Sequence, residues 1–341
     1  MSAKGRMAMQ QVRAEIDLGA IRSNARCFAA LAGGAALCAV VKADAYGHGA
    51  SMVAHALRGI ADSFAVALVE EGASLRNAGI DEDILVLVPP LNREEVLRGC
   101  AYGLIFLLSD AADAALIAEV CDQFGLSARC HIKVNTGMNR FGFDGAEFAL
   151  FLRRPHGRLR IEGIASHFYR PEDTETTAAQ FRSFQEFCAR AEDVFGPLRK
   201  HIAATGGVLA SPGYGLDMVR VGIGLYGYVP SGLAPLPQLR RAMRVYAPVA
   251  SVRKYAGGGM GYGARRPIGK DLFVVRAGYA DGLFRNERLC MDAFVAEGRA
   301  EKYGEVCILS DADACAAASG TISYEVLARI GGRAVREYVD R

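Results

Sequence analysis

The sequence predicts an α/β protein, with a (β/α)8 barrel followed by a mostly β C-terminal domain. Short apolar, β-branched runs alternate with helical patterns from about residue 36 to 223, and the chain changes character beyond residue 229. No Gly-x-Gly-x-x-Gly motif follows the first run. The alternation favours eight βα units in a barrel over an open doubly wound sheet, and the missing glycine motif weakens a dinucleotide-binding alternative.

The barrel strands are expected where the apolar runs lie. The run from Ile84 to Val88 is almost continuously apolar, as is typical of a strand buried on both faces. Helical patterns fall between the runs, for example at Glu70 to Ala78, Ala111 to Phe124 and Thr176 to Phe195. The predicted strands are 36–42, 63–69, 84–88, 103–108, 129–135, 160–167, 199–204 and 217–223.

Two further regions complete the predicted architecture. Ahead of the barrel, Val12 to Ile16 forms a short strand pattern, and Asp17 is placed to cap the helix that follows. After a proline-interrupted linker, β-type runs cover Tyr246 to Val252, Leu272 to Ala277, Ala293 to Glu297 and Glu305 to Leu309, before a helical pattern from Ser323 to Ile330. We expect domains at 12–229 and 238–341, with the N-terminal strand at about 10–16 available to join the second.

Composition narrows the class of protein. The 341 residues are 51% hydrophobic and 23% charged, with a net charge of +3, which gives no reason to expect nucleic acid or a membrane as partner. No apolar run approaches the length of a membrane span. Nine scattered cysteines without a Cys-x-x-Cys spacing indicate reduced thiols in the cytoplasm and neither a disulfide framework nor a metal site.

The most informative segment is Val40-Val41-Lys42-Ala43-Asp44-Ala45-Tyr46-Gly47-His48-Gly49. Lys42 stands where an apolar run gives way to a glycine-punctuated loop. A lysine that merely ends a strand and points into water is the ordinary interpretation of one such residue. An amine at the mouth of a buried strand can instead lose hydration and form a Schiff base with an aldehyde.

Other candidate residues follow the carboxyl ends of the predicted strands, where barrels carry their functional groups. Any one of these residues, taken alone, is more simply explained by a structural role than by a functional one. Several cations and histidines at one rim are hard to explain by packing, because buried charges need partners. These residues are Lys133, Asn135, Arg140, His167, His201, Thr205, Arg220, Gly222 and Ile223.

Two glycine-bearing loops end the barrel, Thr205-Gly206-Gly207 and Gly222-Ile223-Gly224. Glycine lets backbone N–H groups approach a phosphate closely, and the last two barrel loops often bind one. Turns need glycines in any case, so the motifs are weak by themselves. Combined with the amine of Lys42, they match the two ends of pyridoxal 5′-phosphate (PLP).

The decapeptide around Lys42 resembles the cofactor-lysine motif of alanine racemases, which are PLP enzymes of fold type III. The resemblance covers nearly the whole chain, from Ala14-Glu15-Ile16-Asp17-Leu18 to the segment Tyr324 to Ile330. It implies a PLP-dependent isomerase (EC 5.1.1.1) that interconverts L- and D-alanine and supplies D-alanine for cell-wall precursors. It also implies a homodimer with shared active sites.

The resemblance assigns a role to each barrel residue. Lys42 binds PLP covalently and is one catalytic base, while Arg140 binds the phenolic oxygen and the substrate carboxylate. Lys133 matches a lysine that is carbamylated in some members and orients that arginine. His167 packs on the pyridine ring, His201 bonds Arg220, and Arg220 faces the pyridine nitrogen. The phosphate is bound by Tyr46, Thr205, Gly222 and Ile223.

The second domain supplies the remaining residues that the resemblance implies. Tyr262, in Gly261-Tyr262-Gly263, is the second catalytic base and enters from the partner subunit. Tyr279 narrows the substrate entrance, and Met291 contacts the substrate carboxylate through its backbone. Arg285 and Arg288 line the entrance.

The sequence also departs from the family pattern. The segment between Gly282 and Cys290 is short, and Tyr169-Arg170-Pro171-Glu172 replaces small residues and an aspartate on the substrate path. Asn135, Thr205 and Ala293 replace an aspartate, a serine and a glutamine. The alternatives are a racemase of serine or of a bulkier or basic amino acid, another fold-type-III PLP enzyme, or a non-catalytic PLP-binding protein that lacks the second domain.

Overall fold

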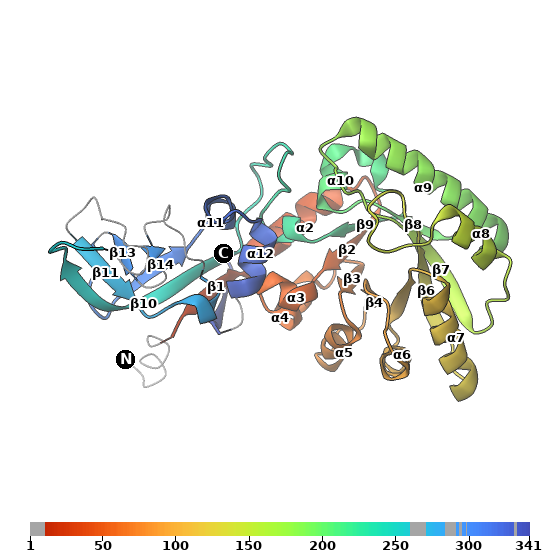
Figure 1. Ribbon diagram of the computed structural model, residues 1–341, viewed down its shortest axis with the longest axis horizontal. Helices are drawn as coiled ribbons and strands as arrows, with labels where there is room; N and C mark the ends of the chain where they lie inside the picture. The colour runs from red at the N-terminus through yellow and green to blue at the C-terminus, as the bar shows by residue number, and fades with distance from the viewer. Residues whose placement is uncertain (1–10, 260–270, 284–290, 293–294, 298, 331–332) are drawn as a thin grey trace. The chain divides into compact units, whose positions relative to one another are not determined.

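The structure is a computed structural model that describes residues 11–259, 271–283, 291–292, 295–297, 299–330 and 333–341. The chain divides into two compact units, each considered by itself. One contains residues 22–43 and 50–239; the other contains the described residues of 1–21, 44–49 and 240–341. Figure 1 shows the elements of both.

The first unit is a parallel barrel of eight strands, which confirms the predicted fold class. The strands pair in the order β8-β7-β6-β5-β4-β3-β2-β9. The ring closes where β8 meets β9, through the bond from the Arg220 N–H to the Ala203 carbonyl (3.0 Å) and a bridge between Ala204 and Arg220. The strands are β2 Ala36–Val40, β3 Ser63–Val66, β4 Asp83–Val86, β5 Ile105–Leu108, β6 Ala128–Lys133, β7 Leu159–Ala165, β8 Arg199–His201 and β9 Met218–Val221.

Helices surround the barrel strands (Figure 1), and side-chain caps fix where several of them begin. Asn92, Asp110, Asp144 and Asp173 each accept a hydrogen bond from the first turn of the next helix, which satisfies N–H groups that lack a helical partner. The helices are α2 Leu18–Leu31, α3 Lys42–Tyr46, α4 Ala50–Leu57, α5 Val69–Asn77, α6 Arg93–Ala101, α7 Ala111–Phe124, α8 Gly145–Leu152, α9 Thr174–Phe195 and α10 Thr205–Ala210.

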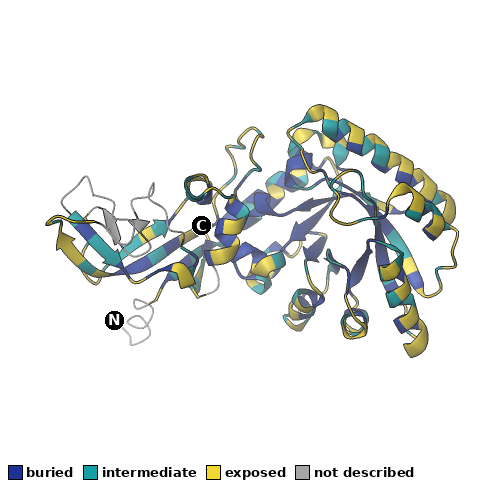
Figure 2. Ribbon diagram, in the orientation of Figure 1, coloured by how far each residue is buried: buried dark blue, intermediate teal, exposed yellow. Residues whose placement is uncertain are grey.

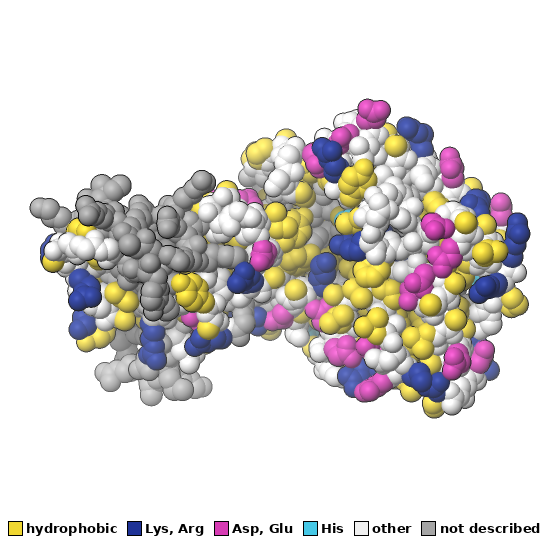
Figure 3. Space-filling model, in the orientation of Figure 1, with side chains coloured by type: hydrophobic (Ala, Val, Ile, Leu, Met, Phe, Trp, Pro, Cys, Tyr) yellow, Lys and Arg dark blue, Asp and Glu magenta, His cyan; other side chains and the backbone are white. Residues whose placement is uncertain are grey.

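The barrel core lies in the strands. Every residue of β3, β5 and β9 is buried, and Figure 2 shows the strands buried and the outer faces of the helices exposed. On the face shown in Figure 3, Lys and Arg side chains are interspersed with Asp and Glu over the barrel helices. No helix in the described part of the chain is long and apolar enough to cross a membrane.

Seven of the eight predicted strands run too far at their carboxyl ends. The first ends at Val40 and not at Lys42, the sixth at Ala165 and not at His167, and the seventh at His201, before Thr205 begins α10. The eighth ends at Val221 and the fifth at Lys133. Ile202 and Ile223 remain buried after the backbone has left the regular strands, so hydrophobicity marks burial there and not strand pairing.

The second unit is built on a sheet that joins the two ends of the chain. β1 Arg13–Asp17 pairs antiparallel with β10 Met243–Lys254 and parallel with β15 Val335–Val339, a strand absent from the prediction. β10 also pairs with β11 Asp271–Val275 and β14 Glu305–Leu309. The remaining elements are β12 Met291–Asp292, β13 Val295–Glu297, α11 Ala312–Ser319 and α12 Ser323–Ile330.

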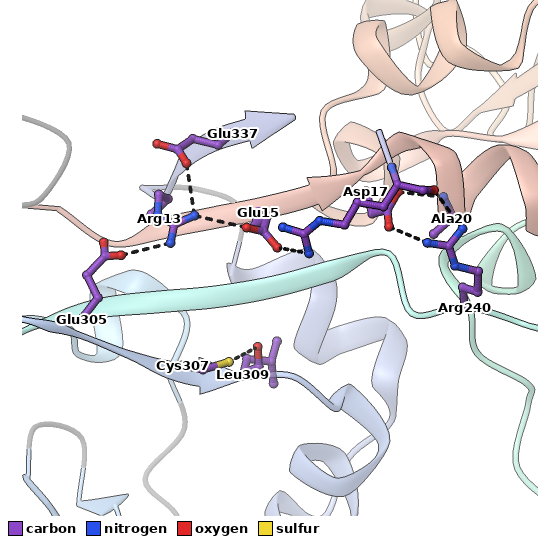
Figure 4. A network of polar contacts seen from close by, with 10 residues as sticks. Arg13, Glu15, Asp17, Ala20, Arg240, Glu305, Cys307, Leu309 and Glu337 are labelled. Atoms are coloured by element: carbon purple, nitrogen blue, oxygen red, sulfur yellow. Dashed lines mark hydrogen bonds and ion pairs between the residues drawn. The ribbon is translucent and has the colours of Figure 1, made fainter. Parts of the chain in front are cut away.

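Charged side chains connect the strands of this sheet (Figure 4). Arg13 contacts Glu305 of β14 at 3.0 Å and Glu337 of β15 at 3.1 Å, and its guanidinium stacks on the Tyr246 ring of β10 at 4.4 Å. Asp17 accepts a bond from the Ala20 N–H (2.9 Å), which confirms the predicted helix cap.

Candidate active site

Lys42 lies at the carboxyl-end rim of the barrel, where β2 gives way to an unusual turn. Ala43, Asp44, Ala45 and Tyr46 all have positive φ, between 51° and 55°, so α3 is a left-handed turn made without glycine. L-residues pay about 1–2 kcal/mol each in this conformation. A strained turn of this kind persists only where its surroundings restrain it, and such strain concentrates at functional sites.

His48 satisfies the backbone of this turn from inside. Its ring Nδ1 lies 2.9 Å from the Ala45 carbonyl and 3.1 Å from the Tyr46 carbonyl, so Nδ1 carries the proton and donates. The N–H groups of His48 and Gly49 bond the Ala45 and Asp44 carbonyls at 3.0 and 2.9 Å. Burial lowers the pKa of His48 to about 4, which keeps the ring neutral.

The amine of Lys42 is half-buried, and burial together with the charge of Arg140 lowers its pKa, against the opposing charge of Glu71. The same effects act more strongly on Lys133 of β6: burial, then Arg220 and Arg140, hold its pKa well below the ordinary value. A neutral lysine amine is the nucleophilic and basic form. Both lysines are therefore suited to covalent chemistry.

Arg220 of β9 is buried and is held by neutral groups. Its guanidinium donates to the carbonyls of Ser166 (2.7 Å), His201 (3.0 Å) and Ile202 (3.2 Å), and it contacts ring nitrogens of His201 and His167. None of its bonds in the described part of the chain goes to a carboxylate. Burial lowers its pKa to about 10, so the group remains a cation at neutral pH.

A chain of two histidines fixes the orientation of Arg220. Arg220 can only donate, so the Nδ1 of His201 accepts and its Nε2 carries the proton. That Nε2 lies 2.8 Å from the Nδ1 of His131, which must then accept. Burial lowers the pKa of His131 to about 3 and that of His201 well below its usual range. Both rings are neutral, and their tautomers follow from the arginine.

Sequence reasoning did not single out His131. It lies two residues before Lys133 on β6, and side chains alternate along a strand, so both point to the same face. Gly163 of β7 makes room for the ring, because a Cβ there would lie 2.8 Å from it. The available signal was this alternation within Cys130-His131-Ile132-Lys133.

Backbone N–H groups converge beside Thr205, at the start of α10. The hydroxyl oxygen of Thr205 accepts from Gly222 (3.4 Å) and Gly224 (3.3 Å). Gly224 has no room for a side chain, since a Cβ would lie 2.4 Å from the Phe28 ring and 2.9 Å from Thr205. We call this arrangement, which lies where the sequence predicts phosphate binding, the Thr205–Gly222–Gly224 cradle.

Arg140 lies on an exposed loop after β6, and Asn135 shapes that loop. The Asn135 side-chain oxygen accepts from the N–H groups of Gly137 (3.0 Å) and Asn139 (3.1 Å). An asparagine can build this turn as well as an aspartate, because only the oxygen is used. His167 follows β7 and lies 3.3 Å from Arg220 through Nδ1.

The remaining predicted residues belong to the second unit. The buried Tyr46 packs edge-on against Tyr324 with 5.9 Å between ring centroids, and Tyr324 is a residue that sequence reasoning missed. Burial raises the pKa of Tyr324 to about 12. Tyr279 begins a short helical turn and is 49% exposed, and Met291 lies in β12. Tyr262, Arg285 and Arg288 lie outside the described residues.

The barrel rim thus gathers Lys42, Lys133, Arg140 and Arg220, with neutral histidines among them. Such a site favours a ligand with several negative charges. An amine of lowered pKa for an aldehyde, a cradle for a phosphate and a cation that can only donate together fit PLP.

Comparison with known proteins gives consistent results. Residues 16–230 match the family model described as the alanine racemase N-terminal domain. The alanine racemase of Desulfovibrio desulfuricans is 35% identical, over 96% of this chain and 98% of the relative. That of Streptomyces coelicolor is 33% identical, over 98% of this chain and 97% of the relative.

Solved structures agree with the sequence relatives. The alanine racemase from Streptomyces coelicolor superposes with a TM-score of 0.89 at 32% identity, covering 98% of this chain and 100% of that one. The alanine racemase from Bartonella henselae, described with covalently bound pyridoxal phosphate, superposes with a TM-score of 0.84 at 26% identity, covering 96% of this chain and 99% of that one.

Proposed function

The chain belongs to the alanine racemase family, and we propose that it interconverts L-alanine and D-alanine with PLP bound at Lys42. The observation that carries the proposal is the pairing, on one barrel rim, of an amine of lowered pKa with the Thr205–Gly222–Gly224 cradle. When bound, PLP makes the α-proton of an attached amino acid removable by delocalising the developing negative charge.

Each barrel residue then has a definite task. Lys42 would hold the aldehyde carbon and, once a substrate amine has displaced it from that carbon, would exchange the α-proton on one face, for which its lowered pKa is suited. Arg220 would donate to the pyridine nitrogen of bound PLP and would keep that nitrogen unprotonated, because a guanidinium has no acceptor. Thr205 and the backbone of Gly222 and Ile223 would hold the phosphate, with Tyr46 as a further hydroxyl donor. His167 would pack on the pyridine ring of PLP, and His201 fixes Arg220.

Racemisation requires a second proton carrier on the opposite face, because one group cannot reach both faces of a planar carbon. We propose Tyr262 of a partner subunit for this role, so that the enzyme is a homodimer with shared sites. Arg140 and the Met291 backbone bind the substrate carboxylate, and Tyr279 narrows the entrance. Carbamylation of Lys133 is favoured by the low pKa of its amine and would place a negative charge beside Arg140.

The cellular role follows from the same assignment. We propose that the enzyme is cytoplasmic and supplies D-alanine for cell-wall precursors. All eight cysteines in the described part of the chain are free thiols, which suits a reducing compartment.

One alternative concerns the substrate. Tyr169 is 44% exposed, and Arg170 pairs with Glu172 at 3.4 Å, so a bulky and charged segment follows His167. A racemase of serine or of a larger or basic amino acid would use the same catalytic groups. The non-catalytic alternative predicted a barrel without the second unit, and that unit is present.

Two measurements test the proposal. The purified protein should show the absorbance of lysine-bound PLP and racemise alanine, and Lys42→Ala should abolish both. A panel of amino acids, followed by chiral chromatography, should give alanine the highest kcat/KM. The mechanism would be contradicted if Lys42→Ala kept full racemase activity. The choice of alanine as substrate would be contradicted if another amino acid were turned over faster. The role of Tyr262 would be contradicted if the protein were active as a monomer.

A further inference from the structure

The left-handed turn after Lys42 is held by one residue from the far end of the chain. The consecutive carbonyls of Asp44, Ala45, Tyr46 and Gly47 all accept hydrogen bonds. Gly49 and His48, which are local, supply the donors to the first three. The Gly47 carbonyl accepts from the Nε of Arg336 at 2.9 Å, across 289 residues of sequence. Arg336 therefore supplies the hydrogen bond to the last of the four carbonyls.

The same guanidinium reaches the opposite end of the turn. Its Nη2 lies 2.6 Å from the Asp44 carboxylate, so one planar group bridges Asp44 and Gly47. The Arg336 side chain is only 23% exposed, whereas that of Asp44 is 52% exposed. A guanidinium presents its donors in a fixed fork, so binding both groups fixes their separation. Lysine has no such geometry.

The strand that carries Arg336 is itself anchored. In β15, Arg336 and Tyr338 are in register with Ala14 and Ile16 of β1. Tyr338 covers Gly49, where a Cβ would lie 2.0 Å from the phenol oxygen and φ is +92°. Arg336 and Tyr338 lie on one face of the strand, and Glu337, on the other, pairs with Arg13. The sheet thus supplies a rigid base.

We infer that Arg336 is a positioning residue for the reaction: it keeps Ala43 to Tyr46 left-handed, and so fixes the directions in which Lys42 and Tyr46 present their side chains. This inference rests on the proposed function, in which Lys42 holds PLP. Without the bridge, the turn gains access to ordinary negative φ values, which relieve its strain. The Lys42 and Tyr46 side chains then lose the directions that the turn gives them, and cofactor binding and turnover weaken together.

The test compares Arg336→Met with Arg336→Lys, Asp44→Asn and the matched control Glu337→Gln, which alters the neighbouring side chain of the same strand. Asn tolerates positive φ, so Asp44→Asn removes the ion pair without changing the backbone preference. The first readout is hydrogen exchange at the His48 and Gly49 amides in protein stripped of PLP. The second is the dissociation constant for PLP, and the third is kcat and KM for alanine.

We expect Arg336→Met to speed exchange at both amides and to weaken PLP binding by about tenfold each, the factor typical of one lost charge-assisted hydrogen bond. kcat should fall while the KM for alanine changes little. Arg336→Lys and Asp44→Asn should give intermediate effects, and Glu337→Gln should match the wild type. The inference would be overturned if Arg336→Met left amide exchange and PLP affinity unchanged. It would also be overturned if Glu337→Gln had effects of the same size as Arg336→Met.

The design separates this inference from the proposed function. Failure of the wild-type protein to bind PLP at Lys42 would refute the proposed function, while the exchange rates of the stripped protein would still report on the bridge. If the wild type binds PLP normally and Arg336→Met changes neither amide exchange nor PLP affinity, only the positioning role of Arg336 is refuted. Arg336→Lys guards against misfolding of the methionine variant, because it keeps the charge beside Asp44.

Discussion

Arg220 and Lys42 are both basic side chains of the candidate site, and the protein holds them by opposite means. Arg220 lies inside the barrel, where three carbonyls and the neutral rings of His201 and His167 contact its guanidinium. Lys42 begins a strained left-handed turn whose carbonyls are satisfied by His48 and Arg336. A buried cation needs acceptors that cannot move away, whereas a strained turn needs restraints that oppose its relaxation. The surroundings of Arg220 are therefore coupled to the stability of the barrel. The turn after Lys42 mainly controls the geometry of the Lys42 amine.

Removing the buried arginine should have the largest effect. Arg220→Gln leaves several carbonyls without a donor, at about 1–3 kcal/mol for each group left unsatisfied. It also removes the charge proposed to face PLP, and we expect racemase kcat to fall by about 100-fold or more. Urea unfolding and steady-state kinetics measure the two effects.

Arg129→Gln serves as the matched control. Arg129 is half-buried near the start of β6, where it pairs with Asp83 and Glu162. Its loss should lower stability and leave kcat nearly unchanged. Equal losses of kcat in Arg220→Gln and Arg129→Gln would show that Arg220 affects activity only through the stability of the barrel.

Acid should destabilise the folded protein through its buried histidines. The pKa of His48 is about 4 and that of His131 about 3 in the folded protein, because both are buried. In the unfolded chain their pKa is near 6.5, so below that pH the unfolded state binds protons that the folded state does not. The free energy of unfolding should then fall by about 1.4 kcal/mol per pH unit for each histidine, down to about pH 4.

Asp113 opposes this trend, because burial raises its pKa to about 6 and its protonation stabilises the folded state. The two histidines outweigh it. Chemical denaturation between pH 4 and 6.5 gives the slope. His131→Asn keeps an acceptor for His201 and should reduce the slope by about 1.4 kcal/mol per pH unit. An unchanged slope would mean that His131 does not stay neutral in the folded protein.

The smallest expected effect probes the strain of the turn. Ala43 is exposed and has a φ of 51°, so Ala43→Gly should relieve about 1–2 kcal/mol of strain and cost about 0.5–1 kcal/mol of chain entropy. The net change should be neutral to slightly stabilising. In α7 the exposed Ala115 is right-handed, and Ala115→Gly should destabilise by about 1 kcal/mol. Thermal melts measure both, and equal losses would contradict a strained turn.

The sequence predicted the barrel because burial leaves a local mark. Strands such as Ser63–Val66 and Ile105–Leu108 are buried on both faces and read as apolar runs. Lys42, Arg220 and Thr205 were identified because motifs place them beside those runs. The strand ends were predicted poorly, since Ile202 and Ile223 stay buried although they lie beyond the last paired residues of β8 and β9.

The sequence by itself determined the fold class, the family and the residue types of the site, because periodic burial and short motifs are properties of neighbouring residues. Only the tertiary structure decided the handedness of the turn at Ala43 to Tyr46, the tautomers of His131 and His201, and the reach of Arg336 to Gly47. No local preference makes alanine, aspartate and tyrosine left-handed in succession. That conformation depends on a hydrogen bond between residues 289 positions apart, and such a contact exists only once both ends of the chain share one sheet.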